Sequence, residues 1–143
     1  MRCLIDTNVL FSAALFPGKK AHQAFRKAIL DPIEVYVCNY CIDELRRVFT
    51  LKYPDKLVVL ERFIEYSMVD IKILETTDTT FFPDVTKMIR DPKDAPILSA
   101  AIKNDIDIIL SGDKDFVVLG LEKPITVSPS EFLCSLDVPA LSF

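Results

Sequence analysis

The segment from Arg90 to Phe116 constrains the fold most strongly, because it holds a helix start, an amphipathic helix, a buried strand and an exit loop. Pro96 fits only the first turn of a helix, where its missing N–H is not needed, so the helix should begin near Asp94. The apolar run 106–110 is typical of a buried strand, and Gly112 provides a turn after it. The helix is predicted from apolar residues at helical spacing, namely Ala95, Leu98, Ala101 and Ile102.

Carboxylates stand at both ends of this segment. In a parallel sheet with crossover helices, helices start and strands end at the same edge. Asp91 and Asp94 at the helix start should therefore lie near Asp113 and Asp115, which follow the strand. Open α/β sheets bind their ligands at this edge, so we expect the functional site there.

The rest of the chain alternates between strand and helix patterns. This alternation predicts a three-layer α/β/α fold with a mostly parallel sheet. We expect a single domain over 1–143, with its core at about 1–136 and an apolar tail at 137–143. The expected strands are 2–5, 34–38, 69–73, 106–110 and 124–127. The expected helices are 19–30, 39–50, 54–66, 85–89, the helix that starts near residue 94, and 128–136. Asn39 is the expected N-cap of the second of these helices, and Ser128 to Glu131 form a capping box at the start of the last.

Composition excludes some classes of protein. The formal charge is −4, from 17 basic and 21 acidic residues, which argues against tight nonspecific binding of nucleic acid unless metal ions neutralise an acidic site. Half of the residues are hydrophobic, which suggests a buried subunit interface and hence a homodimer. The helix 54–66 has more apolar surface than one core-facing stripe needs, so Leu57 and Leu60 are candidates for that interface.

Location and cysteine use are also predicted. No apolar run approaches the ~20 residues that span a bilayer, and Asp6 interrupts the apolar N-terminus, so we expect a cytoplasmic protein that does not bind membranes.

Cys38 and Cys41 form a C-x-x-C motif, but a zinc site would need two further ligands from Cys3, Cys134 and His22. We therefore expect reduced, mostly buried cysteines.

Four acids are predicted to meet at the carboxyl edge of the sheet: Asp6, Glu44, Asp94 and Asp113. Such a cluster requires cations or protons at neutral pH. Oxygen ligands without histidine or thiolate suit Mg²⁺ or Mn²⁺, which activate water and neutralise charge on a phosphodiester.

Each acid also has a simpler interpretation. Asp94 fits a helix cap, Asp113 and Asp115 fit turn residues, and Glu44 fits a solvated helix position. Asp6 is the hardest to dismiss, because strands disfavour a lone acid. The predicted convergence of the four acids on one edge of the sheet favours a metal-binding site over these separate roles. Basic residues on two helices fit solvated faces or a path for an RNA backbone, and they are Lys19, Lys20, Arg26, Lys27, Arg46 and Arg47.

Four motifs resemble the PIN-domain ribonucleases, a family that includes VapC-like toxins of toxin–antitoxin pairs. They are LIDTNVL at 4–10, CIDELRRVF at 41–49, DPKDAPILSAA at 91–101 and IILSGDKDF at 108–116. The resemblance covers essentially the whole chain. It implies a 3-2-1-4-5 parallel sheet, Mg²⁺- or Mn²⁺-dependent cleavage of single-stranded RNA, and possible neutralisation by a small antitoxin protein.

The resemblance also implies roles for individual residues. Asp6, Asp94 and Asp113 would be metal ligands, and Glu44 would complete the catalytic acids. The secondary residues would be Asn8, which orders the pocket, Ser111, a hydroxyl beside substrate or metal, and the acids Asp91 and Asp115.

Three alternatives remain open at this stage. A receiver-like signalling module also holds Mg²⁺ in an acidic pocket, but it needs two adjacent acids after the first strand, where this chain has Asp6-Thr7-Asn8. A phosphatase with an aspartyl nucleophile needs a second acid at Asn8. The third alternative is a catalytically idle PIN scaffold.

Overall fold

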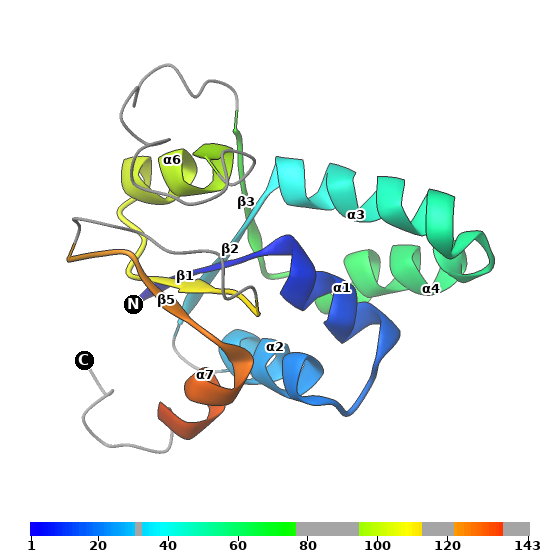
Figure 1. Ribbon diagram of the computed structural model, residues 1–143, viewed down its shortest axis with the longest axis horizontal. Helices are drawn as coiled ribbons and strands as arrows, with labels where there is room; N and C mark the ends of the chain where they lie inside the picture. The colour runs from blue at the N-terminus through cyan, green and yellow to red at the C-terminus, as the bar shows by residue number, and fades with distance from the viewer. Residues whose placement is uncertain (31–32, 77–94, 113–121, 136–143) are drawn as a thin grey trace.

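A computed structural model describes residues 1–30, 33–76, 95–112 and 122–135 (Figure 1). Within these residues, five strands form one sheet in the order β3-β2-β1-β4-β5, and every neighbouring pair is parallel. The expected α/β fold and strand order are confirmed. The strands are β1 (Arg2–Ile5), β2 (Glu34–Cys38), β3 (Lys72–Leu74), β4 (Ile108–Leu110) and β5 (Ile125–Val127).

Helices flank this sheet. In Figure 1, α6 lies on one side of the sheet, while α2 and α7 lie on the other, where they pack against each other. Beyond the carboxyl ends of β1 and β2, α1, α3 and α4 pack together. The helices are α1 (Thr7–Leu15), α2 (Lys20–Leu30), α3 (Asn39–Lys52), the 3₁₀ turn η1 (Pro54–Lys56), α4 (Leu57–Arg62), the π-helical turn η2 (Phe63–Ser67), α6 (Ala95–Lys103) and α7 (Pro129–Ser135).

The core is built around β1, the central strand. Cys3, Leu4 and Ile5 are completely buried, because β1 has neighbours on both edges and helices on both faces. The largest buried side chains around it include Phe25 of α2, Phe49 of α3 and Phe132 of α7. This packing fixes the point at which β1 ends and the chain enters α1.

Helix α1 was not expected from the sequence. Its buried stripe includes Val9, Leu10 and Ala13, but the opposite side carries the partly buried Phe11 and Leu15, so no polar face stands opposite the apolar stripe. A helix buried on several sides shows no amphipathic period. The periodicity that reveals α2 was therefore absent from α1.

Three expected boundaries were wrong. Cys38, and not Asn39, is the N-cap residue of α3. The third strand begins at Lys72 rather than 69, and Val69 lies outside it, 73% exposed. The fourth strand begins at Ile108 rather than 106. In both strands the register with the neighbouring strand, Lys72 with Tyr36 and Ile108 with Cys3, sets where pairing begins.

The expected helix over 54–66 is divided into η1, α4 and η2. Leu60 is completely buried and belongs to the core, so its assignment to a partner surface was wrong. The exposed apolar residues in this region are Leu51 at 76%, Val58 at 64% and Val59 at 48%. They form the exposed apolar face of α3 and α4.

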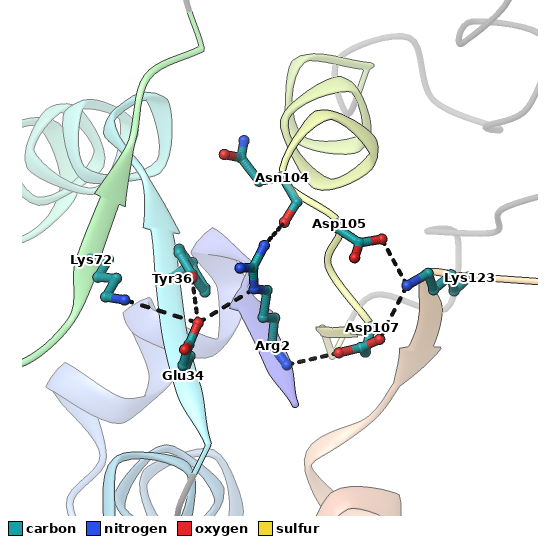
Figure 2. A network of polar contacts seen from close by, with 8 residues as sticks. All are labelled: Arg2, Glu34, Tyr36, Lys72, Asn104, Asp105, Asp107 and Lys123. Carbon is teal, nitrogen blue, oxygen red and sulfur yellow. Dashed lines mark hydrogen bonds and ion pairs between the residues drawn. The ribbon is translucent and has the colours of Figure 1, made fainter.

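Charged side chains link the amino ends of the five strands, opposite the predicted site (Figure 2). Glu34 before β2 pairs with Arg2 of β1 at 3.4 Å and with Lys72 of β3 at 3.9 Å. The hydrogen bond from the Tyr36 hydroxyl, with the charge of Lys72, lowers the pKa of Glu34.

The same network continues to the other side of β1. The Arg2 amide donates to Asp107 Oδ2 at 2.9 Å, and Lys123 joins Asp107 to Asp105 (Figure 2). These pairs are exposed, so each contributes little to stability. These ion pairs lie at the amino ends of the strands, whereas the predicted site lies at their carboxyl ends.

Several expectations fall outside the described residues. These are the short helix at 85–89, the limit of the core at 136 and the apolar tail at 137–143, while the single-domain assignment stays a prediction. Among the described helices, none is both long and apolar enough to cross a membrane.

Candidate acidic site at the carboxyl edge of the sheet

Asp6 is held at the point where β1 ends. It is the N-cap of α1, and its Oδ1 accepts a hydrogen bond from the Thr7 amide at 2.7 Å. Its own amide donates to the Leu110 carbonyl of β4 at 3.0 Å. The residue is only 5% exposed. A carboxylate is thus placed at the sheet edge by backbone contacts on both sides.

Ser111 and Asn8 connect the end of β4 to the same acid. The Ser111 hydroxyl donates to Asp6 Oδ2 at 2.9 Å. Asn8 Nδ2 lies 3.4 Å from Ser111 Oγ, and the Gly112 amide donates to Asn8 Oδ1 at 3.0 Å. Asp6, Asn8 and Ser111 therefore lie together, and Asn8 connects the two chain segments that leave β1 and β4.

Gly112 does not have the role expected of it. Among the described glycines, only Gly18 has a positive φ. A Cβ added at Gly112 would meet Asn8 Oδ1 at 3.6 Å, an ordinary contact. The turn after β4 is therefore held by the Asn8–Gly112 hydrogen bond and does not depend on glycine's conformational freedom.

Glu44 lies in the second turn of α3 and is partly buried. Burial, and after it the charge of Glu44, raises the pKa of Tyr40, which lies one turn earlier in α3. Cys41 lies near Thr7 and Asp6, since both residues influence the pKa of its thiol. Since Glu44 follows Cys41 by three residues, it lies on the side of α3 that faces the end of β1.

Two buried thiols, those of Cys3 and Cys41, have raised pKa values and remain protonated at neutral pH. Burial raises the pKa of Cys3 to about 12. A hydrogen bond with Cys38, followed by burial, raises the pKa of Cys41. All four cysteines are free and all except Cys134 are buried, as expected. The raised pKa values of Cys3 and Cys41 disfavour the thiolate form that binds metals.

The oxygen donors at this edge suit a hard divalent cation. In the described part of the chain, Asp6 and Glu44 provide carboxylate oxygens, and Ser111 adds a hydroxyl. These donors fit Mg²⁺ or Mn²⁺ better than a thiophilic metal. Residues 1–30, 33–76, 95–112 and 122–135 hold no group of three acids, histidines or cysteines that could bind a metal by themselves. Asp91, Asp94, Asp113 and Asp115 lie outside the described residues.

Other predicted residues have ordinary contacts. His22 Nδ1 accepts a hydrogen bond from the Gly18 amide at 3.0 Å. Arg46 forms a 2.9 Å ion pair with Glu61. Lys27 Nζ donates to the Leu133 carbonyl of α7 at 3.2 Å. Arg46 and Lys27 therefore have structural partners.

Two residues were missed as part of the site. Burial and then the nearby charge of Glu44 raise the pKa of Tyr40, and the i, i+4 spacing of the two residues in α3 was the signal that could have paired them. Asn39 Oδ1 accepts hydrogen bonds from the Tyr40 amide, the Thr76 amide and the Thr76 hydroxyl. No local pattern predicts the contact with Thr76, which lies 37 residues away.

The sheet of this protein is parallel, and a buried acid, Asp6, lies where its central strand ends. Both features are typical of α/β proteins whose functional site lies at the carboxyl edge of the sheet. The model of the PIN domain family matches residues 2–115. The chain belongs to the PIN domain family.

Solved structures share the fold. The structure of VapBC2 from Rickettsia felis bound to a DNA fragment from their promoter aligns with a TM-score of 0.65 and 12% identity, covering 90% of this chain and 98% of that one. FitAcB from Neisseria gonorrhoeae aligns with a TM-score of 0.54 and 20% identity, covering 79% of this chain and 88% of that one. No curated protein matches the sequence.

Proposed function

We propose that the protein is a metal-dependent endoribonuclease that hydrolyses phosphodiester bonds of single-stranded RNA. The observation that carries the proposal is the buried Asp6 carboxylate, held by Thr7 and Ser111 at the carboxyl edge of a PIN-domain sheet. Carboxylate and hydroxyl oxygens are the donors that a hard divalent ion selects.

Asp6 is proposed to hold this ion together with Asp94 and Asp113, and Glu44 is proposed to complete the catalytic acids. Bound Mg²⁺ or Mn²⁺ supplies an acidified water and neutralises charge on the phosphodiester. Ser111 and Asn8 keep the Asp6 carboxylate oriented toward the site. Asp91 and Asp115 are proposed as secondary acids.

We further propose that the protein is a cytoplasmic toxin of the VapC type, neutralised by a small antitoxin protein. The resemblance of the four motifs supports this assignment, as does the fold shared with the VapBC2 and FitAcB structures. Copurification of the chain with the product of an adjacent short gene, followed by loss of RNA cleavage in the complex, would test this partnership.

The metal requirement gives the first test. Mg²⁺ or Mn²⁺ should support cleavage of single-stranded RNA, whereas Ca²⁺ should bind and support it poorly, because its larger and looser coordination misplaces the attacking water. The measurement is a gel assay with a labelled single-stranded RNA in each ion and in excess EDTA. Cleavage that continues unchanged in EDTA would contradict the proposal.

The receiver-like alternative predicts a different product. A receiver-like module would need two adjacent acids after the first strand, where Asp6 is followed by Thr7 and Asn8, and Asn8 contacts Ser111 and Gly112. Incubation with a small phosphodonor should therefore leave no acid-stable, alkali-labile phosphoryl group on Asp6. Stoichiometric labelling would favour the signalling module over the nuclease.

We also propose a homodimer that uses the exposed apolar face of α3 and α4. Light scattering is expected to give a mass near twice 16.2 kDa. Replacing both Val58 and Val59 with Glu should halve this mass without unfolding the protein, because both side chains are already largely exposed. A wild-type protein that stays monomeric at micromolar concentration would contradict the dimer.

A further inference from the structure

The side chain of Asn39 joins the first turn of α3 to the chain that leaves β3. Its Oδ1 accepts hydrogen bonds from the Thr76 hydroxyl at 2.7 Å and from the Thr76 amide at 3.0 Å. The same oxygen accepts the Tyr40 amide at 2.7 Å, and Nδ2 donates to Glu75 Oε2 at 3.2 Å. These contacts, here named the Asn39 clamp, use both ends of the side-chain amide.

The register of the sheet brings the two clamped segments together. Cys38 and Leu74 are paired at the ends of β2 and β3, so the residues that follow them leave the sheet side by side at its carboxyl edge. Cys38 is the N-cap residue of α3, but its side chain makes no capping hydrogen bond to the first turn, which lies within the described residues 33–76. Asn39 therefore supplies, from the first helical position, the acceptor that an N-cap side chain usually gives to a free amide.

The Asn39 clamp lies close to a proposed catalytic acid on the same helix. Glu44 follows Asn39 by five residues, a rise of about 7.5 Å along the helix axis. Farther along α3, the ring of Phe49 packs 5.5 Å from the ring of Phe11 in α1. Helix α3 is thus held at two points, and Glu44 lies between them.

Loss of the clamp would release only one of these points. The far part of α3 would stay packed on α1, while the start of the helix would shift relative to the end of β3, and Glu44 would move with it. A displacement of about 1 Å, even when it is caused by a distant change, can reduce a catalytic rate about a hundredfold. The helix backbone transmits the effect, so Asn39 does not need to contact Glu44.

We propose that Asn39 is a positioning residue, which fixes the start of α3 against the end of β3 and so sets the position of the Glu44 carboxylate in the acidic site. The inference rests on the proposed nuclease function. It assigns to Asn39 an effect on turnover that is exerted through α3, with no contact between Asn39 and the RNA.

A double-mutant cycle with Asn39→Ala, Glu44→Gln and the double variant tests this role, with rates measured well below the melting temperatures. Asn39→Ala removes every contact of the clamp and introduces a good helix former. It should lower kcat for single-stranded RNA at least about tenfold and leave KM within about twofold. In the Glu44→Gln background, Asn39→Ala should change kcat by less than about twofold, because the acid that the clamp positions has already been replaced.

A rescue experiment tests the geometry of the clamp. Asn39→Asp keeps the acceptor oxygen for Tyr40 and Thr76, but it loses the Nδ2 donor and places a charge beside Glu75. Glu75→Gln removes this repulsion and provides an amide that can donate to the new carboxylate. The Asn39→Asp/Glu75→Gln protein should regain kcat to within about threefold of the wild type, whereas Glu75→Gln should not rescue Asn39→Ala.

Asn104→Ala is the matched control, because it makes the same substitution at the opposite edge of the sheet. Asn104 Nδ2 donates to the Ala100 carbonyl at 2.8 Å, at the end of α6. Loss of this hydrogen bond should lower the melting temperature and leave kcat within about twofold of the wild type.

Thermal melts in EDTA provide a readout that does not depend on activity. The proteins are the wild type, Asn39→Ala, Thr76→Val and the double variant. Because both substitutions break the same hydrogen bond, the double variant should melt near the less stable single variant instead of lower by the sum of both shifts.

Each other outcome contradicts a defined part of the inference. An unchanged kcat in Asn39→Ala, or an equal loss in both Glu44 backgrounds, would leave a purely structural contact and overturn the positioning role. A raised KM with unchanged kcat would show that Asn39 contacts RNA and would also overturn it. If Asn39→Ala does not fold, the rescue of Asn39→Asp by Glu75→Gln decides, and its failure overturns the role. A wild-type protein inactive with Mg²⁺ and Mn²⁺ would overturn the proposed function, and with it the role, while the melts would show separately whether the clamp exists.

Discussion

Asp6→Asn is expected to reduce RNA cleavage by at least about a thousandfold and to leave the melting temperature in EDTA no lower than that of the wild type. The rate falls because the substitution removes the charge of a proposed metal ligand. Stability is kept because asparagine is a good N-cap and its Oδ1 can still accept the Thr7 amide. The Ser111 hydroxyl can rotate and accept a hydrogen bond from the new amide.

Two further variants separate charge from structure. Asp6→Ala should lose activity to the same extent and also cost about 1–2 kcal/mol of stability, because the cap of α1 is lost. Asp105→Asn removes one negative charge at the opposite edge of the sheet, in a residue whose φ of 55° asparagine tolerates well. This control should cleave RNA like the wild type.

Cleavage rates in Mg²⁺ and melting curves in EDTA, measured on all three variants, decide between two roles for Asp6. If Asp6 only capped α1, Asp6→Asn would keep most of its activity and Asp6→Ala would melt lower. If Asp6 binds the metal, both variants lose activity whatever their stability.

Features encoded in short stretches of sequence were predicted well. The capping box of α7 is present: the Ser128 amide donates to Glu131 Oε1 at 3.2 Å, and the Glu131 amide donates to Ser128 Oγ at 3.1 Å. Strands β1 and β2 have the predicted limits. In these cases the interactions that form the element lie within a few residues, so the pattern contains the necessary information.

Features that depend on distant segments were not predictable from such patterns. The limits of β3 and β4 follow from their pairing with β2 and β1, and the burial of α1 follows from packing against other helices. The strand order came from the resemblance to a family, since an alternation of helices and strands is compatible with several orders.

The candidate site shows the same division. Asp6 was predicted at the edge because it directly follows an apolar strand, and the family resemblance added Ser111. Their hydrogen bond joins residues 105 positions apart, so its existence and direction required a structure. The predicted roles of Asp94 and Asp113 remain predictions.

The region around α4 gives the largest expected effect on stability, through Leu60→Glu. Leu60 has no exposed surface, so its replacement places a carboxylate in the hydrophobic core. An unpaired buried charge costs many kcal/mol, while the total stability of a small domain is about 5–15 kcal/mol. We expect the variant to be unfolded at 25 °C, with a loss of far-UV circular dichroism and of the cooperative melt.

Val59→Glu is the matched control, since it adds the same charge to the preceding residue of the same helix. Val59 is 48% exposed, so the carboxylate can remain in water and the melting temperature should change by no more than about 2 °C. The contrast also tests which side of α4 is available to a partner. A Leu60→Glu protein that stays folded with a cooperative melt would contradict the burial of Leu60 in the core.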